Sequence, residues 1–316
     1  MSSILLPTIH CASAEEFLEA LSPIGPFFLA DPPDAPWLFR GQGRDYPLVP
    51  SAFRPFIFGK GGKLARLSQR TIATYADLLL AERDVLVRFF NLADRRGLVL
   101  PDDSQQLRSN LETLLSERGE LFAGKGYQDW FAADSALSLT AMAQHYGVPT
   151  RLLDWARDVF VAAFFAAEGA VREIATGAKA SEKMVVWSFF FPRLGKQDGI
   201  GTTDPVRIVT APSASNPNLK AQQGVFTKAS RYYTNEDTLH YLPLDQMLKE
   251  LELKYASTNS DAWIQLQDCR LRKFTAPLSE GERLLRLLAK FDVTPSSVYP
   301  GYRSILDDME MMATWS

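Results

Sequence analysis

The sequence predicts an α+β protein with a small mixed or antiparallel sheet, a long helical insertion near the N-terminus and helices at the C-terminus. Helical periodicity dominates the first half of the chain, and strand-like runs come mostly later, without the regular alternation of a doubly wound sheet. The 316 residues are 46% hydrophobic and 22% charged, as in an ordinary globular protein. No internal repeat divides them. We therefore expect residues 1–316 to form a single domain, with residues 60–135 as a mainly helical insertion.

The expected helices follow from apolar residues at helical spacing and from capping residues at their ends. Ser13 suits the N-cap of a short amphipathic helix that ends near residue 22. A hinge at Gly59-Lys-Gly-Gly leads into a long helix over residues 64–96. Gly147 and Pro149 stop a helix that contains Leu137 and His145. Further helices are expected at 104–117, 158–167, 278–290 and 301–312.

The expected strands are short runs rich in β-branched and aromatic residues. They lie at Trp37–Gly41, Met184–Phe191, Val206–Thr210 and Val225–Ala229, with one or two more inside 262–275. Several prolines after the first run keep the chain irregular as far as Arg54.

Composition argues against several classes of protein. With 34 basic and 37 acidic side chains, the net charge of −3 does not indicate a polyanion-binding protein. Two cysteines and three widely separated histidines give no disulfide framework and no metal-ligand spacing, so we expect no metal. Neither a signal peptide nor an apolar run long enough to span a membrane is visible, which predicts a cytoplasmic protein without a membrane partner. No phosphate-binding loop has the required glycine spacing.

The most informative segment runs from Gln144 to Ala167. It places four polar groups among apolar residues: His145, Thr150, Arg151 and Asp154. Burying such groups unpaired costs several kcal/mol each, so they are either paired with one another or directed at a ligand.

Arg40 stands at the end of a predicted strand and is followed by Gly41 and Gln42. A glycine there lets a ligand approach the backbone closely, and the guanidinium can bind a phosphate or carboxylate through two parallel hydrogen bonds. The alternative is a structural ion pair with Asp154 or another core carboxylate.

Thr150, Leu152 and Asp154 would share one face of the extended segment that follows Pro149. With His145 one turn away, a hydroxyl and a carboxylate on that face could form a polar pocket. The alternatives are that Asp154 pairs with Arg151 or Arg157, and that Thr150 caps the local turn. His145 lies on the apolar stripe of its helix, where it is either a hydrogen-bonded core residue or a general base.

Six segments together resemble the FRG domain, which takes its name from a Phe-Arg-Gly signature. They are Phe39–Gln42 with Pro50–Arg54, Ala143–Trp155 with Ala162–Ala167, Ala221–Phe226, and Phe291–Gly301. The resemblance covers about residues 15–312, and its central motif is long and specific.

The order of these motifs is also distantly similar to that of ADP-ribosyltransferases, which implies a pocket for NAD. By this resemblance Arg40 holds phosphate or ribose, Thr150 supplies the second-motif hydroxyl and Gln223 occupies the third-motif position. The implied catalytic residues are Arg40, His145, Thr150, Asp154 and Gln223. The implied cofactor-binding residues are Arg40, Gly41, Gln42, Arg54, Thr150 and Arg151.

Gln223 departs from the enzymatic pattern, which has a glutamate there. An amide cannot supply the negative charge that stabilises a cationic transition state, so Asp154 would have to supply it. The resemblance implies a toxin or phage-defence effector that transfers ADP-ribose to a protein or nucleic-acid acceptor, or hydrolyses NAD. The alternatives are a non-catalytic module that binds a nucleotide, nucleic acid or protein, and a buried structural network of Arg40, Arg151 and Asp154.

Overall fold

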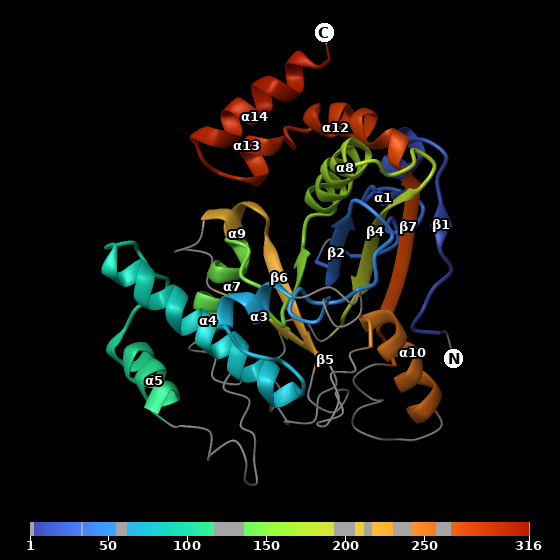
Figure 1. Ribbon diagram of the computed structural model, residues 1–316. Helices are drawn as coiled ribbons and strands as arrows, with labels where there is room; N and C mark the ends of the chain where they lie inside the picture. The colour runs from blue at the N-terminus through green and yellow to red at the C-terminus, as the bar shows by residue number, and fades with distance from the viewer. Residues whose placement is uncertain are drawn as a thin grey trace.

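The computed structural model describes residues 3–32, 34–54, 62–116, 136–192, 206–211, 217–229, 242–256 and 267–315. Its centre is one seven-stranded sheet with the strand order β1-β7-β4-β2-β3-β6-β5 (Figure 1). The strands are β1 (Ile9–His10), β2 (Trp37–Gln42), β3 (Leu153–Ala156), β4 (Lys183–Phe190), β5 (Val206–Val209), β6 (Gly224–Ala229) and β7 (Arg270–Pro277). All neighbours are antiparallel except β1 and β7.

The predicted mixed sheet is therefore confirmed, but the prediction that it is small was wrong. The four strand regions expected from sequence all form within a residue or two of their predicted bounds, and β7 begins at Arg270, inside the predicted 262–275. β1 and β3, of two and four residues, add the remaining strands. Strands so short carry too little alternation to be recognised from sequence.

Eleven α-helices lie within the described residues. They are α1 (Ala14–Leu21), α3 (Lys63–Ser68), α4 (Tyr75–Arg95), α5 (Gln105–Ser116), α7 (Leu137–His145), α8 (Val159–Ala175), α9 (Pro217–Ala221), α10 (Leu244–Tyr255), α12 (Gly281–Ala289), α13 (Pro295–Val298) and α14 (Tyr302–Ala313), and the 3-10 helix η4 (Leu278–Glu280) precedes α12. Helices were predicted at all of these places except α9, α10 and α13. The predicted hinge residues 59–61 lie outside the described residues, as do residues 262–266 of the last predicted strand region.

The single helix predicted over 64–96 is two helices. α3 ends where Gln69 adopts a left-handed backbone with a φ of 59°. α4 then begins with its own N-cap at Thr74, whose side chain accepts a hydrogen bond from the Asp77 amide while the Asp77 carboxylate accepts one from the Thr74 amide. The apolar spacing continues across the break, so periodicity alone did not reveal it.

Two layers cover the sheet. On one face, α1, α8 and α12 pack over a core that includes Phe39, Val186 and Phe274. On the other face, α10 packs over a core that includes Trp155 and Trp187. A third cluster joins α4 and α7 to β6. This arrangement brings β2 and β3, which carry the two main sequence motifs, to the middle of the sheet.

Gly41 is the point of closest approach between the sheet and α8. A Cβ atom there would lie 1.8 Å from the Ala162 carbonyl oxygen and 2.7 Å from the Ala166 amide nitrogen. Gly43 meets Gly169 in the same way, two residues further along. The sequence interpretation was that Gly41 admits a ligand, whereas in the structure a helix backbone occupies that space.

We expect Gly41→Ala to lower the free energy of unfolding by about 1–3 kcal/mol or more, because the new methyl group meets backbone atoms that cannot change rotamer. Urea denaturation measures the loss. Gly224→Ala is a matched control, because its Cβ would meet the Leu219 side chain at 2.3 Å, and that side chain can be shortened. Leu219→Ala should therefore rescue Gly224→Ala, whereas Ala162→Gly should not rescue Gly41→Ala. Equal stability of Gly41→Ala and the unmodified protein would contradict the close packing.

Candidate functional site

Arg40 and Asp154 form an ion pair between the two main motifs. β2 and β3 share a single paired position, Phe39 with Ala156, and no paired position joins Arg40 or Gly41 to β3. Beyond that paired position, the Nη1 atom of Arg40 donates a hydrogen bond of 2.9 Å to the Asp154 carbonyl and lies 2.7 Å from Asp154 Oδ2. The Arg40 side chain is 8% exposed and that of Asp154 is 57% exposed. A buried guanidinium thus takes the place of a missing strand hydrogen bond and holds a carboxylate in contact with solvent.

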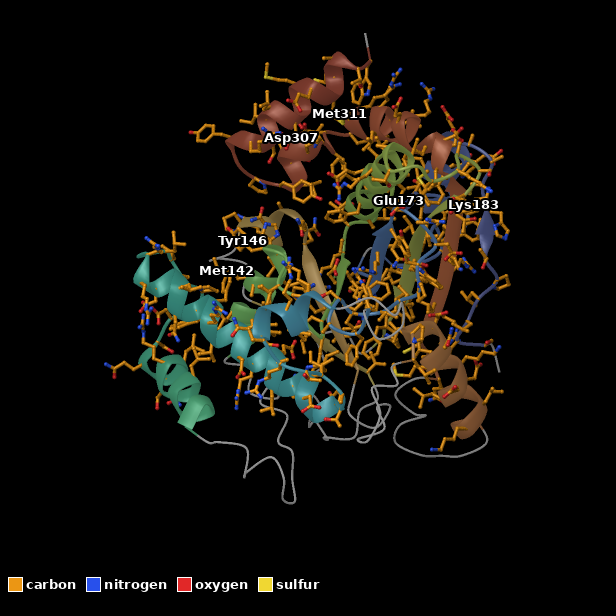
Figure 2. The ribbon with its side chains drawn as sticks, viewed as in Figure 1. Met142, Tyr146, Glu173, Lys183, Asp307 and Met311 are labelled. Atoms are coloured by element: carbon orange, nitrogen blue, oxygen red, sulfur yellow. The ribbon has the colours of Figure 1, made fainter. Side chains whose placement is uncertain are left out.

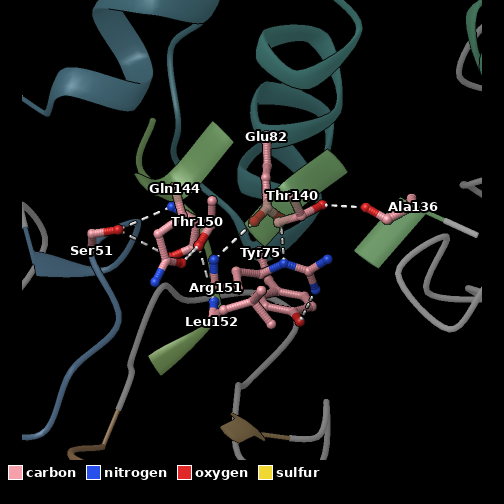
Figure 3. Close-up of polar contacts among 9 residues, drawn as sticks. All are labelled: Ser51, Tyr75, Glu82, Ala136, Thr140, Gln144, Thr150, Arg151 and Leu152. Carbon is pink, nitrogen blue, oxygen red and sulfur yellow. Dashed lines mark hydrogen bonds and ion pairs between the residues drawn. The ribbon is translucent and has the colours of Figure 1, made fainter. Parts of the chain in front are cut away.

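Gln144, at the end of α7, extends this pair. Its Nε2 atom donates to Asp154 Oδ1 at 3.3 Å, and its Oε1 atom accepts a hydrogen bond from the Thr150 hydroxyl. Thr150 is fully buried, and its amide donates to the Ser51 hydroxyl at 3.0 Å (Figure 3). We call Arg40, Gln144, Thr150 and Asp154 the polar junction. Gln144 was not among the predicted site residues, although it lies beside His145 in the sequence.

The electrostatics of the polar junction keep Asp154 ionised. Surrounding protein atoms desolvate its carboxyl group and so oppose ionisation, but the charge and the hydrogen bond of Arg40 outweigh that cost and hold the pKa of Asp154 below its usual range. Desolvation, followed by the nearby charge of Arg40, also lowers the pKa of Arg54. Arg54 donates from Nε to the Val49 carbonyl at 3.1 Å and exposes part of its side chain. A second cation therefore lies close to the ion pair.

The C-terminal segment also reaches this region. The Tyr299 hydroxyl donates to Glu168 on α8 at 3.1 Å, and its ring lies edge-on to Phe164 and Phe165. The pKa of Tyr299 is raised by desolvation and by the negative charge of Glu168, with a further contribution from Asp154. Tyr299 is therefore a near neighbour of the polar junction.

The lowered pKa of Asp154 predicts an acid-sensitive contribution to stability. Because its folded pKa lies below the unfolded value of about 3.9, the ion pair stabilises the protein above that pH, and its contribution is lost as the pH falls through the folded value. Unfolding at a series of acidic pH values should show a smaller loss of stability for Asp154→Asn than for the unmodified protein. NMR of the carboxyl carbon measures the pKa directly, and a value at or above the usual range would contradict the ion pair in solution.

Arg151 lies in a separate buried network. Its guanidinium Nε is 2.5 Å from Glu82 Oε2, and its amide donates to Glu82 Oε1 at 2.8 Å. Its Nη1 donates to the Tyr75 hydroxyl at 2.9 Å (Figure 3). Arg151 is 3% exposed and Glu82 is fully buried. The structure therefore separates Arg151 from the Arg40–Asp154 pair, with which it had been grouped as one possible network, and places its charge against α4.

Two other predicted residues lie outside the polar junction. His145 was expected on the apolar stripe of its helix, but the residue is exposed, and its ring lies roughly perpendicular to the Tyr146 ring with 5.2 Å between centroids. Desolvation lowers its pKa. Gln223 is exposed in a left-handed turn with a φ of 46°, where its carbonyl accepts from the Arg157 amide. Because Phe226 is the β6 residue opposite Asp154, Gln223 lies about 10 Å further along the strand.

The Gln42 side chain also forms a hydrogen bond within the protein. Its Oε1 atom accepts a hydrogen bond from the Trp187 indole at 3.1 Å, and the residue is buried. Of the predicted site residues, the structure thus joins Arg40, Thr150 and Asp154, with Arg54 nearby.

Comparison with known families agrees with the motifs. The model of the FRG domain matches residues 35–173. The match contains the whole polar junction together with Arg54, Glu82 and Arg151, whereas Gln223 and Tyr299 lie beyond it. No curated protein and no solved structure matches the chain.

Two further properties concern the described residues alone. Within them, no helix is long and apolar enough to cross a membrane. Nor do their histidine, cysteine and acidic side chains form a group of three or more that could hold a metal ion.

Proposed function

We propose that the FRG domain binds NAD or a closely related nucleotide at the polar junction and cleaves its glycosidic bond, either transferring ADP-ribose or releasing it to water. One observation carries this proposal. Arg40 and Asp154, from two motifs more than a hundred positions apart, meet in one ion pair in which the Asp154 side chain is 57% exposed to solvent. A pair needed only for packing has no requirement for that exposure.

The proposed role of Asp154 is electrostatic. Cleavage of a nicotinamide glycosidic bond develops positive charge on the ribose, and a fixed carboxylate stabilises that charge. The lowered pKa of Asp154 means that the group is ionised at neutral pH, so it suits this role and not that of a general acid. Gln223 carries no charge, and its position about 10 Å along the strand leaves this role to Asp154.

We assign the phosphate contact to Arg54 rather than to Arg40. The Arg40 guanidinium is buried and donates to Asp154, so it orients the carboxylate. Arg54 lies close to the same pair and keeps part of its side chain exposed, so its free guanidinium edge can bind a pyrophosphate. This chemistry needs no metal, and NAD would be consumed as a substrate.

Purified protein incubated with NAD tests the proposal. Release of nicotinamide, followed by chromatography, supports cleavage, and labelled NAD with added protein or nucleic acid distinguishes transfer from hydrolysis. Calorimetric titration with a non-hydrolysable NAD analogue measures binding separately. The absence of both turnover and binding would overturn the proposal.

A non-catalytic nucleotide-binding module is the second candidate. It is favoured by the fact that both Asp154 carboxylate oxygens already have partners, Arg40 on Oδ2 and Gln144 on Oδ1. Binding of the NAD analogue without nicotinamide release would select this alternative.

A role as a toxin or phage-defence effector would follow from NAD consumption. Induced expression in a bacterial host should then lower cellular NAD and slow growth, and Asp154→Asn should not. Normal NAD content after induction of an active, soluble protein would argue against that role.

A further inference from the structure

An exposed aromatic ring lies directly beside the polar junction. Tyr146 is the C-cap of α7 and follows Gln144 of the junction by two positions. The residue is 63% exposed (Figure 2). Its ring stacks on Phe89 of α4, with 6.4 Å between centroids and 28° between planes, and the His145 ring meets it nearly at right angles. Neighbouring rings thus hold Tyr146 in place while most of the residue reaches solvent.

Basic side chains flank this ring. The Lys63 ammonium of α3 donates a hydrogen bond of 2.5 Å to the carbonyl of Gly147, the next residue in the chain, and an ammonium has further donors for a ligand. Arg66 is exposed and follows one turn later on the same side of α3. Arg96 is exposed at the end of α4 and follows Phe89 by two turns, so it continues the face of that helix that contacts the ring.

Few acidic side chains oppose these cations. Residues 62–76, which include α3, and residues 136–153, which include α7, contain no aspartate or glutamate. On α4, Asp84 and Asp94 are already ion-paired with other arginines. The net charge of −3 therefore does not describe this surface, which is locally positive.

We propose that this surface binds a single-stranded nucleic acid, with a base stacked on the open face of the Tyr146 ring and phosphates bound by the three cations. Every base presents a flat face to an aromatic ring, and cations bind the backbone phosphates without reading sequence. In a duplex the bases are stacked inside and cannot reach the ring. An acidic peptide would use the cations but would leave the exposed ring without a role.

The surface adjoins the polar junction, so a bound strand lies where the acceptor of the proposed transfer has to lie, and this part rests on the proposed function. Gln144 connects the two through its hydrogen bond of 3.3 Å to Asp154. In the transfer, the bond from ribose C1′ to nicotinamide breaks, and nicotinamide leaves with the electron pair. A nitrogen or oxygen of the strand forms the new bond to C1′ and releases its proton to water.

Fluorescence anisotropy of the full chain with a labelled single strand of about 12 nucleotides, as DNA and as RNA, tests the binding without NAD. The association constant should fall with salt, with a log–log slope of about −2 for three phosphate contacts. Lys63→Gln should make that slope shallower by about 0.7. Lys249→Gln is the matched control, because it removes an exposed lysine from α10, over the other face of the sheet, and should leave the slope unchanged.

The aromatic contact has its own test. Tyr146→Ala should weaken binding about fivefold or more, because the stacking of one base is lost, and Tyr146→Phe should keep the affinity. Tyr302→Ala, at a 94% exposed tyrosine of α14, is the control and should bind normally. Thermal unfolding checks that each variant is folded. No binding at about 100 μM protein in low salt, full affinity of Tyr146→Ala, or equal competition by polyglutamate would each contradict the proposal.

Labelled NAD separates a failure of this inference from a failure of the proposed function. If the strand binds and NAD is not cleaved, the proposed function fails and the binding surface stands. If NAD is cleaved and the bound strand carries no label, the strand is not the acceptor. Where transfer occurs, Tyr146→Ala should lower the amount of labelled strand relative to the nicotinamide released.

Discussion

Glu82→Gln is expected to lower the free energy of unfolding by about 3–5 kcal/mol, because it leaves the Arg151 guanidinium buried opposite an uncharged side chain. Glu82 is fully buried and accepts from both the amide and the Nε of Arg151. The substitution keeps the shape of the side chain, so the loss reports charge and hydrogen bonding more than packing. Urea denaturation monitored by circular dichroism measures it.

Two controls separate this effect from a general sensitivity of α4. Asp94, also on α4, forms an exposed ion pair with Arg108 of α5. Asp94→Asn removes that pair and should cost less than about 1 kcal/mol. Replacing both partners, Glu82→Leu with Arg151→Met, should recover much of the stability, since a buried ion pair can often be exchanged for apolar packing. A loss below about 1 kcal/mol for Glu82→Gln would mean that water reaches the pair.

Asp154→Asn is expected to reduce nicotinamide release by about a hundredfold or more while lowering the thermal midpoint less than Glu82→Gln does. This prediction rests on the proposed function. Removing one electrostatic contact to a transition state costs about 2.7–4 kcal/mol. The substitution removes the stabilising charge beside the buried Arg40, but the asparagine oxygen can still accept a hydrogen bond from Arg40 and its side chain is largely exposed, so the loss of stability should be modest. Steady-state kinetics and differential scanning calorimetry of the same preparation provide both values.

Companion variants sharpen that result. Asp154→Asn combined with Gln223→Glu should remain inactive, because the new charge is about 10 Å away along the strand. Arg40→Ala should lower both activity and stability, since it also frees the Asp154 carbonyl. If Asp154→Asn instead lowers the thermal midpoint strongly and leaves activity intact, the Arg40–Asp154 pair is structural.

The local parts of the fold could be predicted from sequence, whereas the pairings between distant segments could not. The helix stop at Gly147, the Ser13 cap and the buried α8 all follow from neighbouring residues. Nothing near Glu82 in the sequence indicates its contact with Arg151, 69 positions away. The helix α10 was not predicted, although Leu244, Met247, Leu248 and Leu251 recur at helical spacing and indicate an amphipathic helix.

The sequence interpretation placed His145 in the site, whereas the structure places its neighbour Gln144 there, and this difference has a physical reason. Adjacent helical residues point about 100° apart, so identifying the inward residue requires the phase of the helix. α7 is buried on several sides and has no clear polar face, which leaves that phase undetermined. Gln144 therefore contacts Thr150 and Asp154 where the sequence interpretation had favoured His145.

The backbone contact of Gly41 and Gly43 with α8 has a consequence for how the site could respond to a ligand. β2 at Gly41 and the chain just after it at Gly43 approach the main chain of α8, and β3 leads into α8 through only two residues. The strands that bear Arg40 and Asp154 should therefore move together with α8 as one rigid body, so their relative geometry is preorganised during folding. Any closure around a bound molecule should come from outside this body. Tyr299 lies beside this body, where it donates a hydrogen bond to Glu168 and packs edge-on against Phe164 and Phe165 of α8.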